Sequence, residues 1–418
     1  MSPFSTVGFG KAYPSVPGGA IICPDHSLTW LMKYSDRILN TPSSFIRDIL
    51  KVLDAPDIIS FAGGLPNPVS FPIDALKEAI NEAIRKNGSK LFQYATTEGY
   101  VPLREMIAQK YRNKFGLDVV AEDILITNGS QQALELIGTV VLNKGDTVLM
   151  EEPGYLGAIQ AFSLCEPAFM AVPLEEDGLN LEKLEAVLKN HPVKLIYCVP
   201  NFQNPTGLTY SLEKRKAIRQ LVAQYDIAFI EDDPYGELRF RGESLPYIGA
   251  GHLENSILLG SFSKTVTPGM RLGFLITKNA QLMRYLVTAK QGSDLHTNIL
   301  TQYAIHEYLL NNPYEEHVRK IVELYRTQST AMLEAMERYF PETVSYTKPE
   351  GGMFIWATLP EGQSALKLFP RAMERKVAFV PGDPFYVSKK DVNTLRLNYT
   401  NATPDVIAEG IRRLGSIL

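Results

Sequence analysis

Lys264 is the residue best placed for covalent chemistry in this sequence, because it directly follows SILLGSFS, at the end of a predicted buried strand. An amine at the end of a buried strand is partly desolvated, which lowers its pKa and favours the neutral form that a Schiff base requires. Ser261 and Ser263 precede Lys264, and Arg271 follows it in TPGMRLG. Hydroxyl groups and a bidentate arginine beside such an amine suit a phosphate group. By position alone, a surface lysine in a turn explains Lys264 equally well.

Ser130 and Gln131 lie in NGSQQ, between a predicted strand and the predicted helix QQALELIGTVV. Backbone N–H groups at the N-terminus of a helix bind phosphate well. The segment is neither a P-loop nor a GxGxxG dinucleotide fingerprint. Ordinary helix caps have the same composition, so NGSQQ indicates a phosphate site only in combination with other segments.

The segment EDDPY places carboxylates at the end of another apolar run. Asp232 would pair with a protonated pyridine nitrogen and keep the ring an electron sink. Tyr235, three residues on, would donate to a phenolic oxygen of the same ring. A solvated acidic turn is the alternative, and for Glu231 and Asp233 it is the preferred interpretation.

Three further side chains extend this hypothesis, and each has a plainer alternative. Asn204, in NPTG, would donate to the same ring oxygen, or simply form an Asn-Pro turn. Tyr155, in EEPGY, would stack on the ring, or serve as a core tyrosine. Arg396 alternates with apolar residues in TLRLNYT, where a buried guanidinium needs a partner. A substrate α-carboxylate would be a bidentate partner; a structural ion pair is the alternative.

Five apolar runs predict the element that positions these residues. Each run ends in polar, Gly- or Pro-containing sequence: ILIT, TVLM, KLIYCVP, IAFI and SILLG. Amphipathic segments alternate with them, which predicts a largely parallel sheet covered by helices, an α/β fold. Ligands of open α/β sheets bind at the carboxyl ends of the strands. The sequence therefore predicts one shared site built from distant segments.

The two ends of the chain differ from this central pattern. A long helical stretch from residue 314 to 340, then short strands in GGMFIWATL, VAFVPG and TLRLNYT, predicts a smaller α+β unit. Residues 1–28 are rich in Gly, Pro and Ser and have no periodicity, which favours an N-terminal arm over a secretory signal.

Composition excludes several classes of protein. The net charge of −4 argues against nucleic acid or an anionic membrane as the main partner. The 3 cysteines are far apart and form no CxxC, so no disulfide framework or metal site is expected, and a reducing cytoplasm fits best. No apolar run reaches the roughly 18 residues of a membrane helix.

Taken together, the motifs resemble fold-type I, class I/II aminotransferases, which use pyridoxal-5′-phosphate (PLP). The motifs that carry the resemblance are AGGLPNP, QYATTEGYVPLR, TNGSQQALEL, EEPGY, NPTG, EDDPYGEL, SFSKTVTPGMRLG, KPEGGMFIW and RLNYT, in family order over residues 60–400. The forms AGGLPNP, GSQQ and DDPYGEL point to the aminoadipate/kynurenine and archaeal aromatic branch. The resemblance implies a large PLP-binding domain over residues 61–322, with a mostly parallel seven-stranded sheet. A small domain would combine residues 29–60 and 323–418.

The resemblance also assigns roles to matching positions. Lys264 becomes the Schiff-base lysine and proton shuttle, and Arg396 takes the substrate α-carboxylate. Residues expected to contact the cofactor are Ser130, Gln131, Tyr155, Asn204, Asp232, Tyr235, Ser261, Ser263 and Arg271. Gly64 would line the substrate site by its backbone. Tyr94 matches a tyrosine that reaches the phosphate of the neighbouring subunit, which implies a homodimer with shared sites.

The implied reaction moves an amino group from an L-amino acid to a 2-oxo acid. Glutamate and 2-oxoglutarate are expected as one pair, with an aromatic, 2-aminoadipate or aliphatic amino acid in the other. Arg47 matches an arginine that meets a side-chain carboxylate, although a surface helix arginine is an equal alternative. Two rivals remain: a PLP-dependent lyase on the same fold, and a PLP-binding transcription regulator. The short Gly/Pro-rich arm disfavours the regulator.

Overall fold

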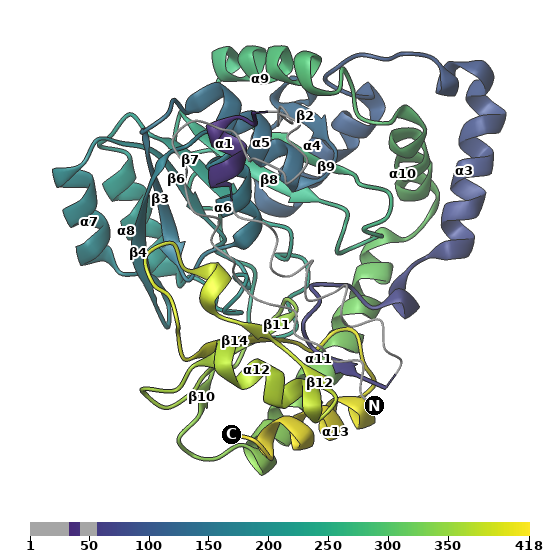
Figure 1. Cartoon of the computed structure of the whole chain (residues 1–418). Helices are drawn as coiled ribbons and strands as arrows, with labels where there is room; N and C mark the ends of the chain where they lie inside the picture. Colours follow the sequence, from purple (N-terminus) through teal and green to yellow (C-terminus); the bar gives the residue numbers. More distant parts are fainter. Residues whose placement is uncertain (1–32, 42–56) are drawn as a thin grey trace, which may run out of the picture.

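The computed structural model describes residues 33–41 and 57–418 of the chain (Figure 1). The expected N-terminal arm, residues 1–28, lies outside the described residues, and so does Arg47. Among the helices of the described ranges, none is both long and apolar enough to cross a membrane.

The centre of the molecule is a twisted sheet of eight strands in the order β2-β9-β8-β7-β6-β3-β4-β5. All of them run in one direction except β9 and β5. The resemblance implies seven strands; the additional one is β5, a two-residue strand that folds back on β4 after Asp177, because an Asp-Gly pair favours a tight hairpin. The strands are β2 (Ile124–Thr127), β3 (Thr147–Glu152), β4 (Ala168–Glu175), β5 (Gly178–Leu179), β6 (Val193–Cys198), β7 (Ala228–Asp232), β8 (Ser256–Ser261) and β9 (Gly273–Ile276).

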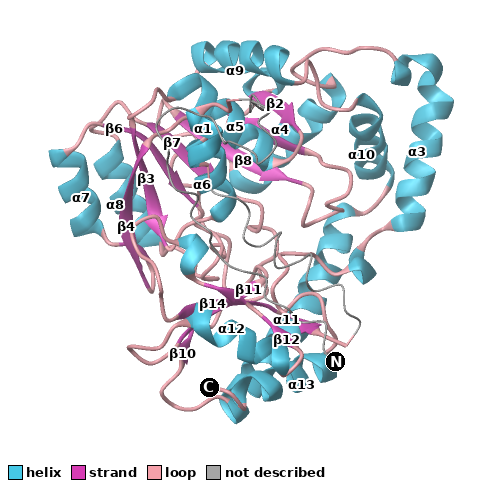
Figure 2. Cartoon of the chain, viewed as in Figure 1, coloured by secondary structure: helices cyan, strands magenta, loops and turns pink. Residues whose placement is uncertain are grey.

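Helices cover both faces of this sheet (Figure 2). Side chains alternate between the faces along each strand, so Met150 and Leu195 pack against one helical layer while Leu149 and Ile196 pack against the other. The first layer contains α5 (Ser130–Val141), α6 (Leu156–Ser163) and α9 (Ala280–Ser293); the second contains α7 (Leu181–Asn190) and α8 (Leu212–Val222). Helix α4 (Val101–Phe115) packs on the sheet at its β2 and β9 end. Farther out lie α1 (Asp36–Asn40), α3 (Ile73–Asn87) and α10 (Ile299–Asn311).

The C-terminal part forms a smaller α+β unit, drawn in yellow-green below the large sheet in Figure 1. Its antiparallel sheet has the order β10-β11-β14-β13, and β1 pairs with β12 beside it. The elements are β1 (Ile59–Ser60), α11 (Tyr314–Tyr339), β10 (Ser345–Tyr346), β11 (Phe354–Thr358), α12 (Ala365–Glu374), β12 (Val377–Ala378), β13 (Val380–Pro381), β14 (Thr394–Asn398) and α13 (Pro404–Gly415). The predicted boundary at residues 322/323 falls within the continuous helix α11.

The five apolar runs singled out in the sequence are the strands β2, β3, β6, β7 and β8. They are parallel to one another, so their carboxyl ends lie along one edge of the sheet. Two hydrogen bonds tie this edge to residues near the smaller unit: Lys264 donates to the Gly64 carbonyl, and Arg396 donates to Asn204. The predicted convergence of distant segments is confirmed.

Candidate active site

Lys264 follows β8 and lies partly buried between the two units. Its amine donates to the carbonyl oxygen of Gly64 at 2.7 Å. Burial lowers the pKa of Lys264 to about 8, helped by the positive charges of Arg396 and Arg271. A substantial fraction of this amine is therefore neutral near pH 8, as a nucleophile and proton shuttle requires.

One end of the site carries groups suited to an anion. Arg271 donates to the backbone carbonyl of Asn128 at 3.2 Å, in the turn that begins α5. Gly129 has φ +75°, and a Cβ there would lie 2.9 Å from the Arg271 guanidinium, so only glycine admits the arginine this close. The Ser130 hydroxyl is buried without a hydrogen-bond partner in the described structure. These groups and the N-terminus of α5 form a cradle for phosphate.

The remaining predicted phosphate residues have other contacts as well. Ser261 accepts a hydrogen bond from the Ser263 backbone N–H at 3.1 Å, which shapes the turn before Lys264. The side-chain amide of Gln131 donates to the Gly157 carbonyl at 2.8 Å and so joins α5 to α6.

Asp232 ends β7 and is buried within the site. The hydroxyl of Tyr197 donates to its Oδ2 at 2.8 Å, whereas its Oδ1 is buried with no partner among the described residues. Burial raises the pKa of Asp232 to about 7. A cationic N–H aimed at Oδ1 would satisfy this atom and hold Asp232 ionised. Sequence reasoning missed Tyr197, because a tyrosine within an apolar run reads as a core residue.

Asn204 joins two of the predicted contacts. Its amide nitrogen donates to the Tyr235 hydroxyl at 3.2 Å, and its amide oxygen accepts from Arg396 at 2.9 Å. Arg396 also donates to the Ala62 carbonyl at 2.8 Å, while its Nε is buried without a partner in the described part of the chain. Burial lowers the pKa of Arg396 to about 10. A carboxylate is a suitable hydrogen-bond acceptor for the unpaired Nε–H of Arg396.

Tyr155 precedes α6 and packs directly over Gly157. A Cβ at Gly157 would lie 2.5 Å from Tyr155 Cζ, so any side chain there would displace the ring. This close packing fixes the height of the Tyr155 ring above α6.

Tyr94 lies away from this cluster. Its side chain is 80% exposed, and its ring meets His296 edge-on at a centroid distance of 6.0 Å. Within the described structure, the hydrogen bonds of Lys264 and Asp232 go to Gly64 and Tyr197, not to Tyr94 of the same chain.

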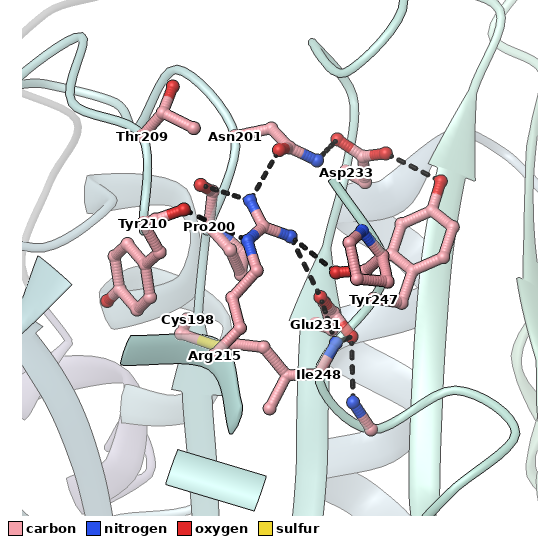
Figure 3. Close-up of polar contacts among 12 residues, drawn as sticks. Cys198, Pro200, Asn201, Thr209, Tyr210, Arg215, Glu231, Asp233, Tyr247 and Ile248 are labelled. Atoms are coloured by element: carbon pink, nitrogen blue, oxygen red, sulfur yellow. Dashed lines mark hydrogen bonds and ion pairs between the residues drawn. The ribbon is translucent and has the colours of Figure 1, made fainter. Parts of the chain in front are cut away.

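The interpretation of Glu231 and Asp233 as a solvated acidic turn is wrong. Glu231 is buried on the opposite face of the sheet, where it accepts from the backbone N–H groups of Ile248 and Gly249 (Figure 3). Asp233 accepts from Asn201 at 2.9 Å and from Tyr247 at 2.8 Å. The buried Arg215 donates to Asn201 and lies 3.9 Å from Glu231, which balances the acids. Consecutive residues of a strand face opposite sides, so these acids stand behind the site.

The donor set fits PLP. A phosphate group would meet Ser130, Arg271 and the N-terminus of α5 at one end. A protonated ring nitrogen would meet the unpaired oxygen of Asp232. Between these ends lie Lys264 for covalent attachment and the Asn204–Tyr235 pair for the ring oxygen.

Comparisons with known proteins agree with this geometry. Residues 56–414 match the family model for aminotransferases of class I and II. Aromatic-amino-acid aminotransferase 1 of Thermococcus litoralis is 41% identical over 391 residues, 92% of this chain and 94% of the relative. The crystal structure of kynurenine aminotransferase from Pyrococcus horikoshii, in complex with PMP, has a TM-score of 0.88 and 43% identity, over 92% of this chain and 96% of that one.

A third relative binds a cofactor adduct. The crystal structure of α-aminoadipate aminotransferase from Thermus thermophilus, complexed with N-(5′-phosphopyridoxyl)-L-leucine, has a TM-score of 0.85 and 44% identity, and the match covers 92% of this chain and 97% of that one. The extent of the family match, the identities and the fit of the donor set lead to one conclusion: the chain belongs to the class I and II aminotransferases, enzymes that transfer amino groups with PLP as cofactor.

Proposed function

We propose that this aminotransferase uses glutamate and 2-oxoglutarate as one substrate pair, with an aromatic amino acid, 2-aminoadipate or an aliphatic amino acid in the other. The observation that carries an α-amino acid as the substrate is the buried Arg396, held by Asn204 and Ala62 with its Nε unpaired within the described structure; the choice of glutamate follows the resemblance to the family. Every α-amino acid brings a carboxylate for this guanidinium. The names of the relatives, which act on aromatic amino acids, kynurenine and α-aminoadipate, support the second pair.

Lys264 is proposed to carry the proton in this reaction. Bound PLP supplies an electron sink that accepts the electron pair of the cleaved Cα–H bond. The neutral amine of Lys264, whose pKa is lowered to about 8, would take the proton from the substrate Cα and deliver it to the cofactor carbon that bears the transferred nitrogen. Its partner in the structure, the Gly64 carbonyl, would orient the amine between these two positions. Arg396 holds the substrate carboxylate so that the α-proton faces Lys264.

The other predicted residues hold and tune the cofactor. Asp232 is proposed to pair with the ring nitrogen, and Tyr235 and Asn204 to hydrogen-bond the ring oxygen. Tyr155 would stack on the ring at the height set by Gly157. The phosphate is assigned to the cradle at the start of α5, together with the turn before Lys264. The residues proposed for the phosphate are Ser130, Gln131, Ser261, Ser263 and Arg271.

The assembly is proposed to be a homodimer with shared sites. The exposed Tyr94 supports this proposal, because a ring that is 80% exposed is available to a second copy of the chain. Tyr94 would then reach the partner's phosphate group. We also propose that residues 61–322 form the cofactor-binding domain, with residues 29–60 and 323–418 in the small domain. The widely spaced cysteines support a cytoplasmic location.

An absorbance spectrum of the purified protein, recorded before and after adding L-glutamate, tests the proposal. We expect the visible band of lysine-bound PLP, and glutamate should convert it to the near-ultraviolet band of the aminated cofactor. Lys264→Ala, loaded with PLP, is the matched control and should fail to cycle between the two forms. A visible band that glutamate leaves unchanged would remove glutamate from the proposal. Release of ammonia instead of a second amino acid would favour the lyase rival.

A further inference from the structure

The most completely buried lysine of the described chain lies beside the proposed phosphate cradle. Lys290, in α9, is 0% exposed. Its amine donates to both oxygens of Asp294, at 2.8 and 2.9 Å, and to the side-chain oxygen of Gln132 at 2.8 Å. A buried charge of this kind is costly and needs complete pairing. The proposed reaction uses none of these three residues.

The cluster fixes the orientation of two side-chain amides. A lysine only donates hydrogen bonds, and an ionised aspartate only accepts them. Gln132 must therefore turn its oxygen to Lys290 and its nitrogen to Asp294, which accepts it at 2.7 Å. Asn128 likewise donates its side-chain nitrogen to Asp294, at 2.6 Å. The ion pair thus removes the freedom to flip from both amides.

These oriented amides hold the turn that begins α5. The Gln132 oxygen also accepts from the backbone N–H of Asn128 at 2.9 Å, which closes the turn across residues 128–132. The backbone carbonyl of Asn128 is in turn the acceptor for Arg271. Lys290 therefore connects, through Gln132 and Asn128, to both the helix N-terminus and the arginine assigned to phosphate.

We propose that Lys290 and Asp294 are positioning residues that hold the turn at residues 128–132 in its phosphate-binding geometry. The inference rests on the proposed assignment of the cofactor phosphate to this turn. The ion pair carries no net charge, so it shapes the turn without competing with phosphate for Arg271. A turn held in place before binding loses less conformational freedom when the anion arrives, which strengthens binding.

The experiment compares the affinities of the apoprotein for PLP and for pyridoxal, which lacks the phosphate, by titrating the visible absorbance band. Lys290→Met should weaken PLP binding about tenfold or more, the loss of one charged hydrogen bond. Pyridoxal binding should stay within about twofold, because the rest of the site is intact. The matched control is Lys214→Met, since Lys214 is also buried and pairs with Glu175 and Asp177, on the other helical layer.

A second variant covers the case in which Lys290→Met does not fold. Lys290→Gln/Asp294→Asn leaves no unpaired charge, and it should show the same selective loss for PLP. PLP binding equal to wild type in this variant, or equal losses for PLP and pyridoxal, would overturn the inference. Arg271→Ala separates this failure from failure of the proposed function. If Arg271→Ala weakens PLP and pyridoxal equally, the phosphate assignment itself is wrong.

Discussion

Arg396 and Asn204 share a buried hydrogen bond of 2.9 Å that joins the proposed substrate-carboxylate group to the proposed cofactor-ring group. Asn204 also donates to Tyr235, so the three side chains are linked in a row by hydrogen bonds. The guanidinium lies over Phe354, with 4.4 Å between its Cζ and the ring centroid. The position of the guanidinium is thus fixed before any substrate arrives. A fixed guanidinium can hold a substrate carboxylate in one defined orientation.

The first prediction concerns Arg396→Lys. The variant keeps the charge but loses the planar fork that serves Asn204, Ala62 and a carboxylate at once. We expect kcat/KM to fall about 100-fold for glutamate and for an aromatic amino acid alike, because both carry the same α-carboxylate. Arg239→Lys is the matched control, since Arg239 lies over Phe202 at 4.7 Å outside the site. A loss confined to one substrate would contradict the assignment.

The second prediction follows from the lowered pKa of Lys264. In the apoprotein the amine is protonated below pH about 8 and neutral above it, whereas an exposed lysine loses its proton near pH 10.5. The rate at which the visible band develops after PLP is added should therefore rise through pH 8 and level off above it. Stopped-flow absorbance across pH 6–10.5 measures this rate. A rise centred near 10.5 would refute the lowered pKa.

Tyr197→Phe tests the ionisation of Asp232. Burial raises the pKa of Asp232 to about 7, and the hydrogen bond from Tyr197 opposes that rise. Without the hydroxyl, the pKa of Asp232 should rise further, so a smaller fraction is ionised at a given pH. We expect the acid limb of the pH dependence of PLP binding to the apoprotein to move up by about one pH unit, because Asp232 titrates there before the ring nitrogen pairs with it.

Tyr210→Phe is the control for this shift. The Tyr210 hydroxyl is also buried and donates to a carboxylate, but that carboxylate is Glu151. The acid limb should stay in place in this variant. An unmoved acid limb in Tyr197→Phe would exclude Tyr197 from tuning Asp232.

Mixed dimers test the proposed homodimer with shared sites. Lys264→Ala and Tyr94→Ala homodimers should each be impaired, for different reasons. In a heterodimer of the two, one site carries both defects and the other carries neither. We therefore expect activity to rise above that of both parents after the two proteins are unfolded and refolded together. Activity no greater than the average of the parents would show that Tyr94 does not serve a partner's site.

The sequence predicted well the site residues that follow the ends of strands, and poorly those that lie inside a strand or a helix. The segments after β2, β3, β6, β7 and β8 were expected to converge, and they do, because parallel strands deliver their carboxyl ends to one edge. The sequence analysis missed Tyr197 and Lys290, and one reason explains both. Each lies within a regular element, where its spacing is that of an ordinary core or surface residue, and only packing reveals its partner.

The error at Glu231 and Asp233 has a different cause. Polar residues at the end of a strand usually meet water, but here Arg215 and two backbone N–H groups lie beneath the strand and surround Glu231. Those partners lie in α8 and in the segment that precedes β8, so the sequence around EDDPY does not predict them. Non-local pairing of this kind depends on the tertiary structure.

The alternation of three acids at the end of β7 has a consequence for insertions and deletions. Glu231 and Asp232 face opposite sides of one sheet, and each has its own set of donors. A shift of one residue in the register of β7 would exchange the two sides. If one residue were inserted upstream, Glu231 would take the place of Asp232 and Ile230 that of Glu231. The active side would still receive a carboxylate, but Arg215 would lose its acid and Tyr197 would meet a longer side chain. Insertions upstream in β7 should therefore be selected against, even though they leave the sequence Glu231-Asp232-Asp233 itself unchanged.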